Sequence, residues 1–336
     1  MKAIALMNAP GFDSLTMIDR PIPEPRRQEI VIRVKASALN YRDVEIVRGT
    51  YHTSFELPLV PLSDGVGEVV AIGEDVTRFR IGDRVCGTFW QRWVGGDFDM
   101  AQPSYQLGGP IDGLLSEYAR LDEQGAVMAP PDLSDIEAAT LPCAAVTAWH
   151  ALVTEGALKS GELVLVLGTG GVSLFALQFA VAAGARVIVT SSSDEKLERA
   201  KALGAHATIN YRRHPDWASE VLKLTDGQGV DHVIEVGGPE TFAQSLKSTR
   251  RSGQINVIGY LAGIEGAINP LDIFRRQVRV RGIPVGSRAS FEAMNRAIVH
   301  NDIRPVIDRI FPWTEAAEAL RQLESGGHFG KIALVH

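Results

Sequence analysis

Alternating apolar and polar residues characterise the first part of the chain. In Glu29–Leu39 every second residue from Ile30 to Ala36 is apolar, whereas Arg33 and Lys35 lie on the opposite face. This period of two predicts a half-buried β-strand. The glycines that follow predict further short strands joined by tight turns; they are Gly65, Gly67, Gly73 and Gly82.

From about Ala129 the pattern changes to continuous apolar runs that alternate with helical stretches. Strands that are apolar on both faces indicate a parallel sheet covered by helices on its two sides, which is the doubly wound α/β architecture. The predicted helices include Val172–Ala183 and Asp194–Leu203. The predicted strands are Leu163–Leu167, Arg186–Thr190, Ala207–Asn210, Asp231–Val236 and Gln254–Gly259.

The last part of the chain predicts two helices, Phe291–Val299 and Thr314–Leu323, and a final strand, Lys331–His336. We expect three segments: 1–128 and 289–336 as a discontinuous β-rich domain, with 129–288 inserted as a nucleotide-binding domain. Three independent units are the alternative, although a tail of this length is small for a core of its own.

One long stretch, Thr88–Gly113, has weak periodicity and contains Trp90 and Trp93. Long segments without regular structure inside a compact domain are usually functional or mobile. We therefore expect this stretch to carry information about the substrate.

Charge and cysteine content exclude several classes of protein. The net charge is -6, and no block of Lys and Arg appears, which argues against nucleic acid or an anionic membrane as the main partner. No apolar stretch is long enough for a membrane span, and the first residues do not form a signal peptide. Cys86 and Cys143 are the two cysteines, which favours a reducing, cytoplasmic location.

A glycine-rich turn follows the strand Leu163–Leu167 and leads directly into a helix. It consists of Gly168, Thr169, Gly170, Gly171 and Val172, with Ser173 where a third glycine usually stands. Glycines in this strand–turn–helix context allow a pyrophosphate to approach the backbone amides at the helix start. A turn that merely needs positive φ angles is the alternative.

The end of the second strand of this unit bears on the choice of cofactor. NAD-selective sites carry an acid there, but this chain has a run of hydroxyl residues that includes Ser191. Lys196 lies one turn into the next helix, and Arg212 and Arg213 follow the third strand. Because a carboxylate would repel a 2′-phosphate whereas hydroxyls and cations would hold it, we expect NADP(H) as the cofactor.

The chain resembles the medium-chain dehydrogenase/reductase superfamily, in particular its zinc-free, quinone-oxidoreductase-like branch. The resemblance implies a GroES-like catalytic domain at both ends, a Rossmann domain between them, an active site in the cleft and NADP(H) bound by Ser191, Lys196 and Tyr211. The motifs that carry it are Ala38–Asp43, Asp64–Val70, Gly82–Val85, Leu141–Ala148, the turn at 168–173, Ile209–Tyr211 and Phe329–Lys331.

Zinc members of the superfamily bind their catalytic metal through Cys, His and Cys. The matching positions here hold Asn40, Ser63 and Cys143. The cysteines of the family's structural zinc lobe would fall within Thr88–Gly113, which has none. One thiolate does not make a zinc site, so we expect no catalytic metal.

Without a metal, a substrate whose developing charge is delocalised is the easiest to reduce, such as a quinone or an α,β-unsaturated ketone. A hydrogen-bond donor for its oxygen is still needed, and Asn40 and Tyr51 are the candidates; the resemblance places a proton-donating tyrosine of related enoyl reductases near Tyr51. Asn40 as a turn cap and Tyr51 as a packing aromatic are the alternatives.

We expect the carboxylates of Asp43 and Asp64 to accept hydrogen bonds from backbone groups or from Arg42. The expected substrate pocket contains Phe89, Trp90 and Cys143.

The resemblance further implies contacts to the nicotinamide half of the cofactor from loops after late strands and from the final motif. The residues are Gly237, Ile258, Gly259, Ser287, Arg288, Phe329 and Lys331.

The segment Gln277–Val285 alternates basic and apolar residues at the expected edge of the sheet, where relatives pair, and predicts a homodimer. An edge kept monomeric by its arginines and Pro284 is the alternative.

Three functions remain open at this point. The first is an NADPH-dependent reductase of a small quinone, enone or related carbonyl compound. The second is an alcohol or aldehyde dehydrogenase of the same superfamily, because fold alone does not determine chemistry. The third is a non-catalytic nucleotide-binding protein, as crystallin-like relatives show.

Overall fold

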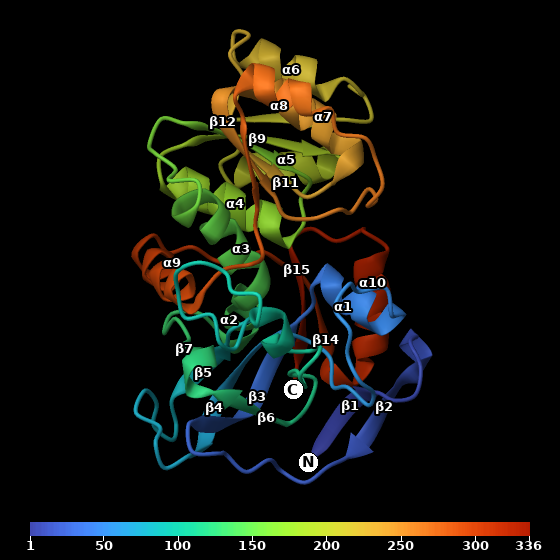
Figure 1. Ribbon diagram of the computed structural model, residues 1–336, viewed down its shortest axis with the longest axis vertical. Helices are drawn as coiled ribbons and strands as arrows, with labels where there is room; N and C mark the ends of the chain where they lie inside the picture. Colours follow the sequence, from blue (N-terminus) through green and yellow to red (C-terminus); the bar gives the residue numbers. More distant parts are fainter. The chain divides into compact units, whose positions relative to one another are not determined.

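The strand predicted around residues 29–39 is the centre of the first of two sheets that carry the fold. The computed structural model describes all 336 residues, and in it β3 (Glu29–Ala38) pairs with β4 (Asp64–Ile72), β6 (Tyr118–Asp122) and β15 (Lys331–Val335), all antiparallel (Figure 1). The sheet is completed by β14 (Ile307–Pro312), β5 (Arg84–Gly87) and β7 (Ala126–Met128), and a separate pair is formed by β1 (Lys2–Leu6) and β2 (Leu15–Asp19).

The C-terminal tail belongs to this first sheet. Its last strand, β15, lies between β14 and β3 in the sheet order. The tail therefore completes the β-rich unit and does not form a third one. The helices of this unit are α1 (Tyr41–Arg48), α2 (Asp135–Ala139), α9 (Arg288–His300) and α10 (Ala316–Glu324).

The chain divides into two compact units, which are 1–146 with 286–336 (unit 1) and 147–285 (unit 2). The first boundary lies later in the chain than the expected 128/129. The reason is that residues after 128 pack on the β-rich unit: Arg84 donates to the carbonyl of Pro130 (2.8 Å), and the thiol of Cys86 donates to that of Ala138 (3.5 Å). Helical turns run through the boundary at 141–145, α3 (Val146–Trp149) and 150–154.

Unit 2 contains six parallel strands in the order β10-β9-β8-β11-β12-β13, which is the order of a doubly wound dinucleotide-binding sheet. The α/β prediction is confirmed. The strands are β8 (Leu163–Leu167), β9 (Arg186–Ser191), β10 (Ala207–Asn210), β11 (Val230–Glu235), β12 (Thr249–Val257) and β13 (Arg279–Gly282). The helices are α4 (Gly171–Ala182), α5 (Asp194–Ala202), α6 (Trp217–Leu224), α7 (Pro239–Ser248) and α8 (Pro270–Arg276).

Every residue of β8 is buried, which explains its uninterrupted apolar sequence. Leu163, Leu165 and Leu167 share one core with Trp217 of α6 and Phe242 of α7. Since side chains alternate along a strand, the two valines between them face the other side of the sheet. The central strand of unit 2 is therefore covered on both faces, as its composition predicts.

The long segment Thr88–Gly113 is held together by aromatic contacts in place of regular structure. Edge-to-face ring pairs join Trp90 with Phe89 and Phe98 (both 4.8 Å between centroids) and Trp93 with Phe98 (5.0 Å). Such pairs stabilise a fold beyond the burial of their area. The segment thus has a defined conformation in which the one regular element is a short 3-10 helix, Gln102–Tyr105.

No helix of either unit has the length and apolar composition that a membrane span requires.

Candidate active site

The glycine-rich turn of unit 2 has the geometry that a phosphate-binding turn needs. Gly168 has a φ of +75°, a conformation that glycine adopts without strain. Gly170 precedes α4, and no side chain caps the first amides of that helix. These amides are therefore free to face an anion, which the positive end of the helix favours.

Ser173 explains why this turn lacks its third glycine. Its hydroxyl donates to the carbonyl oxygen of Leu167 (2.7 Å) and so ties the start of α4 back to the end of β8. The serine is buried, and the hydrogen bond satisfies its polar group.

Ser191 and Tyr211 meet at the carboxyl ends of neighbouring strands. Ser191 ends β9 and is paired in register with Asn210 of β10, and the backbone N–H of Tyr211 donates to the carbonyl of Ser191 (3.1 Å). The ring of Tyr211 is 41% exposed. Lys196 lies in the first turn of α5, where its backbone N–H donates to the hydroxyl of Ser193 (3.3 Å). The structure thus brings the three expected 2′-phosphate residues to one edge of the sheet.

An acid does lie close to this edge, but it is paired. Asp194, the first residue of α5, accepts a hydrogen bond from Asn210 (2.7 Å) and forms an ion pair with Arg213. Arg213 is therefore engaged with Asp194, whereas sequence reasoning offered it as a cation for the cofactor.

The expected nicotinamide-side residues of unit 2 occupy two loops that are bonded to each other. Gly237 follows β11, and Ile258 and Gly259 follow β12. The N–H of Ile258 donates to the carbonyl of Glu235 (2.8 Å), and that of Ala262 to the carbonyl of Gly237 (2.8 Å). Both loops lie at the carboxyl ends of their strands, where open α/β sheets bind ligands.

In unit 1, Asn40 is held by a buried ammonium group. Lys331, only 3% exposed, donates from Nζ to Oδ1 of Asn40 (2.6 Å) and to the carbonyl of Leu39. Because an ammonium has no acceptor, this contact determines which end of the amide is the oxygen. Nδ2 of Asn40 faces the Asp64 carboxylate closely enough to lower the pKa of that acid, but has no partner with ordinary hydrogen-bond geometry.

Two buried carboxylates surround Asn40. Asp43 accepts from the backbone N–H of Asn40 (2.8 Å) and contacts Arg42, while Asp64 accepts from Ser63 (2.8 Å) and from the N–H of Cys143 (3.1 Å). They hold backbone and neighbouring side chains, as the sequence predicts. Burial raises the pKa of Asp43 to about 6, and it also raises the pKa of Asp64, with Lys331 opposing.

Tyr51 belongs to a neighbouring cluster built on Arg42. Its hydroxyl donates to Oε1 of Gln106 (3.1 Å), and the Arg42 guanidinium lies 4.9 Å from the ring centres of both Tyr51 and Phe89. Arg42 also donates to Gln106 (3.2 Å) and to the carbonyl of Leu107 (2.8 Å). Burial raises the pKa of the Tyr51 hydroxyl, so it stays protonated at neutral pH.

These residues do not fit the zinc ion that other members of the superfamily hold. Oδ1 of Asn40 already faces a cation, and the Ser63 hydroxyl is directed at Asp64. Burial raises the pKa of the partly exposed Cys143 thiol, which opposes formation of the thiolate that zinc requires. No group of three or more His, Cys, Asp or Glu side chains is arranged to hold a metal.

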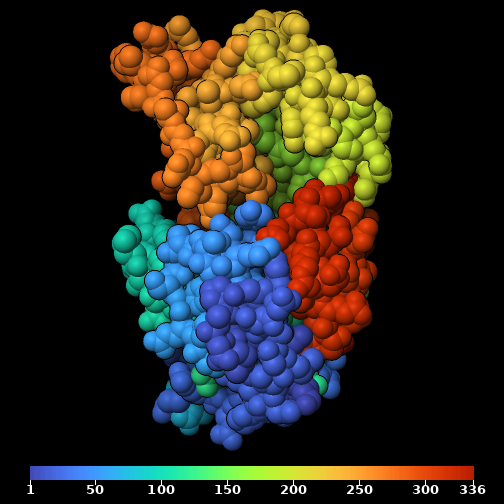
Figure 2. Space-filling view, turned by 90° about the vertical axis from the view of Figure 1, so that its right-hand side faces the viewer, coloured from blue at the N-terminus to red at the C-terminus, as the bar shows by residue number.

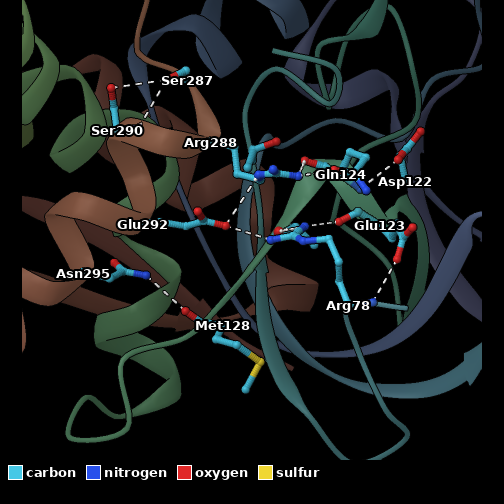
Figure 3. A network of polar contacts seen from close by, with 12 residues as sticks. Arg78, Asp122, Glu123, Gln124, Met128, Ser287, Arg288, Ser290, Glu292 and Asn295 are labelled. Atoms are coloured by element: carbon cyan, nitrogen blue, oxygen red, sulfur yellow. Dashed lines mark hydrogen bonds and ion pairs between the residues drawn. The ribbon is translucent and has the colours of Figure 1, made fainter. Parts of the chain in front are cut away.

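The remaining residues that the resemblance assigned to the cofactor have other partners within unit 1. Ser287 caps α9 by accepting from the N–H of Ser290 (3.2 Å), and Arg288 contacts Gln124 and Glu292, as Figure 3 shows. Glu292 also accepts from Arg78 (2.7 Å), so the start of α9 is tied to the segment before β5 through Arg78 and to the segment before β7 through Gln124. Phe329 is buried, and Lys331 is directed at Asn40.

A polar groove of about 650 Å³ also lies in unit 1, between the residues around Arg20, Asp112 and Tyr118. Asn40, Tyr51 and Cys143 do not line it. The groove is therefore separate from the candidate catalytic residues.

Sequence reasoning missed two residues and one contact that organise these sites. Gln106 was hidden in a segment without periodicity, and the partner of Lys331 lies 291 positions away. Glu235 carried a visible signal, since it is an acid at the end of an apolar strand followed by two glycines.

Taken together, a doubly wound sheet with an open phosphate turn and a GroES-like unit with a buried polar cluster define a nucleotide-dependent oxidoreductase. Comparison with known proteins agrees. Residues 26–131 match the alcohol dehydrogenase GroES-like domain, and residues 171–300 match the zinc-binding dehydrogenase family. The chain belongs to the medium-chain dehydrogenase/reductase superfamily.

Several relatives cover nearly the whole chain. A zinc-type alcohol dehydrogenase-like protein of Schizosaccharomyces pombe is 47% identical, with 96% of each chain aligned. The crystal structure of a putative alcohol dehydrogenase from Sinorhizobium meliloti 1021 is 43% identical, with a TM-score of 0.94 over 100% of this chain and 98% of that one. The confirmed family and fold are those that the sequence motifs indicate.

The names of other relatives differ in cofactor and substrate. A structure described as an NAD-dependent alcohol dehydrogenase is 35% identical (TM-score 0.91, 100% of both chains). A mycobacterial protein solved with NADPH is 26% identical (TM-score 0.84, 100% of both chains). A quinone oxidoreductase of Lama guanicoe is 28% identical over 100% of this chain and 97% of its own.

The raised pKa of Asp43 predicts a specific pH dependence of stability. Because its pKa is about 6 in the folded protein and 3.8 ordinarily, the folded state binds more protons than the unfolded chain between these values. The contribution of this group to stability therefore rises as the pH falls through 6. Asp43→Asn removes this contribution, so the unfolding free energy of wild type minus that of the variant should increase by about 2 kcal/mol from pH 7 to pH 4.

Denaturant unfolding of both proteins at the two pH values measures this difference. Asp97→Asn, at an exposed position, is the control and should show no such change. A difference between wild type and Asp43→Asn that is the same at both pH values would contradict the raised pKa.

Proposed function

We propose that this protein is an NADPH-dependent, zinc-independent reductase of a small quinone, an α,β-unsaturated ketone or a related carbonyl compound. The observation that carries the proposal is the donor set around Asn40. Where a zinc enzyme has metal ligands, this chain has an amide whose oxygen is bonded to the Lys331 ammonium, beside buried carboxylates.

The preference for NADP(H) is supported by the end of β9. The position that carries an acid in NAD-selective sites is Ser191, and the nearby acid, Asp194, is paired with Arg213 and Asn210. Lys196 and Tyr211 lie at the same edge of the sheet. When bound, the cofactor would supply hydride; the glycine turn before α4 would hold its pyrophosphate.

The role we assign to Asn40 is to donate a hydrogen bond from Nδ2 to the substrate oxygen. Lys331 withdraws electron density from the amide oxygen and thereby strengthens Nδ2 as a donor. A fixed donor of this kind stabilises negative charge as it develops on the substrate oxygen. Zinc has this role in the zinc-dependent enzymes of the superfamily. Nδ2 lies near the Asp64 carboxylate but does not bond it with ordinary geometry, so in this role it turns from Asp64 to the substrate oxygen.

Tyr51 has a smaller role in this proposal. Its hydroxyl donates to Gln106, so it would have to exchange this partner to protonate a product. The Arg42 cluster with Phe89 would then shape the substrate pocket, together with Trp90 and Cys143.

An alcohol or aldehyde dehydrogenase is the second candidate, and the names of the relatives from S. pombe and S. meliloti favour it. Cys86 and Cys143 do not form a disulfide, which suits a reducing compartment, so we propose a cytoplasmic location for either activity.

A substrate panel separates these activities. With chelator present, we expect NADPH to be oxidised by quinones and enones faster than NADP⁺ is reduced by primary and secondary alcohols. Rapid alcohol oxidation would favour the second candidate, and tight binding of NADPH without any turnover would favour a non-catalytic protein.

Cofactor preference should follow the charge at position 191. Ser191→Asp places a carboxylate at the end of β9, which repels a 2′-phosphate, and should therefore reduce the ratio of kcat/KM for NADPH over NADH by about tenfold or more. Ser191→Asn is the matched control, because an asparagine side chain has the same shape as an aspartate but carries no charge. If both variants change the ratio equally, the assignment of the 2′-phosphate to this edge is wrong.

Removal of the amide of Asn40 should lower kcat and kcat/KM together, on the order of 10²- to 10³-fold, and leave the Kd of NADPH unchanged. Tyr51→Phe should cost less, since its hydroxyl proton is already donated to Gln106. Steady-state kinetics on the best enone, with Asn295→Ala as a control amide elsewhere in unit 1, measures both effects. Wild-type turnover in both Asn40→Ala and Tyr51→Phe would exclude these residues as the donor.

We also propose a homodimer that pairs through the edge strand β13. All four residues of β13 are exposed, and large apolar side chains nearby are exposed as well, including Phe274 (77%) and Ile264 (74%). Figure 2 shows the orange segment that contains them standing out on the surface of its unit. Unpaired edges and apolar surface of this kind usually have a partner, and a second copy fits both.

Light scattering at micromolar concentration should therefore give a particle of twice 36.4 kDa. Phe274→Asp should shift it towards the monomer, because it places a charge in the proposed interface. Ile310→Asp, at an exposed apolar position of unit 1, should not. A wild-type particle of 36.4 kDa would refute the dimer.

A further inference from the structure

A fully buried carboxylate lies at the carboxyl end of β11. Glu235 is the last residue of the strand and has no exposed surface. Its oxygens accept four hydrogen bonds: from the N–H groups of Gly237 (2.8 Å) and Gly238 (3.1 Å), from the hydroxyl of Thr241 (2.6 Å) and from that of Ser245. A carboxylate has about four acceptor positions, so this group is fully satisfied.

All four donors come from the loop and helix that directly follow the strand. The bonds fold the chain back onto its own strand end and fix the conformation of Gly237 and Gly238. Gly238 has a φ of +92°, and a Cβ there would lie 2.8 Å from the carbonyl oxygen of Gly263. The loop after β11 is thus packed tightly against the loop after β12, and Glu235 joins the two through its backbone carbonyl, which accepts from Ile258.

The first turns of α4 and α7, at this edge of the sheet, differ in the charged groups that lie beside them. At α4 no side chain caps the first amides. At α7 the Glu235 carboxylate receives bonds from the residues that lead into the helix, so its negative charge already offsets the positive end of the helix dipole. A phosphate is therefore favoured at α4 and disfavoured at α7, which leaves the loop after β11 suited to an uncharged group.

We propose that Glu235 is a positioning residue that holds the loops at 237–238 and 258–259 in the conformation that receives the nicotinamide-ribose half of the reduced cofactor, which is uncharged. This inference rests on the proposed binding of NADP(H). Glu235 itself does not touch the ligand in this account; it acts through the two loops.

Glu235→Gln tests the proposal because it keeps the shape of the side chain and replaces one acceptor oxygen with a donor. We expect the Kd of NADPH to rise about 10- to 100-fold, since buried donors lose their acceptor and the loop rearranges. The Kd of 2′-phospho-ADP, which keeps the pyrophosphate but lacks nicotinamide and its ribose, should stay within about twofold of wild type. Titration calorimetry measures both.

Glu162→Gln is the matched control, because Glu162 precedes the opposite end of β8 and bonds His232 (3.1 Å). It should change neither Kd. Thr241→Val removes one of the four bonds and should give a smaller change in the same direction, which provides a second test if Glu235→Gln does not fold.

Equal weakening of both ligands, or of neither, would overturn the role of Glu235. A wild-type protein that binds neither ligand would instead overturn the proposed function itself, and this inference with it. The two failures are thereby distinguished.

Discussion

The buried ammonium of Lys331 is the contact on which the candidate active site depends. A positive charge without solvent is costly unless it is paired and hydrogen-bonded, and here it donates to the Leu39 carbonyl and to Asn40 near the Asp64 carboxylate. To reach them, β15 must lie beside β3, so the C-terminal strand is required for the geometry at the start of α1. The same contact orients the Asn40 amide.

In unit 2 a buried charged side chain also organises its surroundings, but there the charge is negative. The buried carboxylate of Glu235 gathers the donors of the loop after β11, whereas the turn before α4 keeps its amides uncapped. One edge of a parallel sheet therefore offers an anion-binding end and a neutral end. This asymmetry matches a dinucleotide, which carries its charge on the phosphates and has an uncharged carboxamide at its reactive end.

Much of the fold could be predicted from the sequence, because buried positions in strands and helices give a regular pattern of apolar residues. β8 is apolar throughout and is buried on both faces, whereas burial alternates in the strand at 29–39 only from Ile32 to Ala36. The turn between β8 and α4 was also predictable, since Gly168 has a positive φ, which glycine adopts without strain. Contacts between distant side chains give no such pattern: nothing local indicates that Lys331 bonds Asn40 or that Tyr51 bonds Gln106. The unit boundary near 146 was not predicted, because residues 129–146 pack on the first sheet through contacts with residues far away in the chain, such as the hydrogen bonds from Arg84 and Cys86.

The central claim is that hydride passes from NADPH to an activated carbonyl substrate without a metal, with a fixed amide taking the place of zinc. Protein freed of metal by chelation and checked by elemental analysis can be given NADPH deuterated at the reactive carbon together with an enone. The account predicts undiminished turnover and one deuterium in the reduced product, detected by mass spectrometry. Turnover that is lost with the metal and restored by stoichiometric zinc, or a product without deuterium, would contradict it.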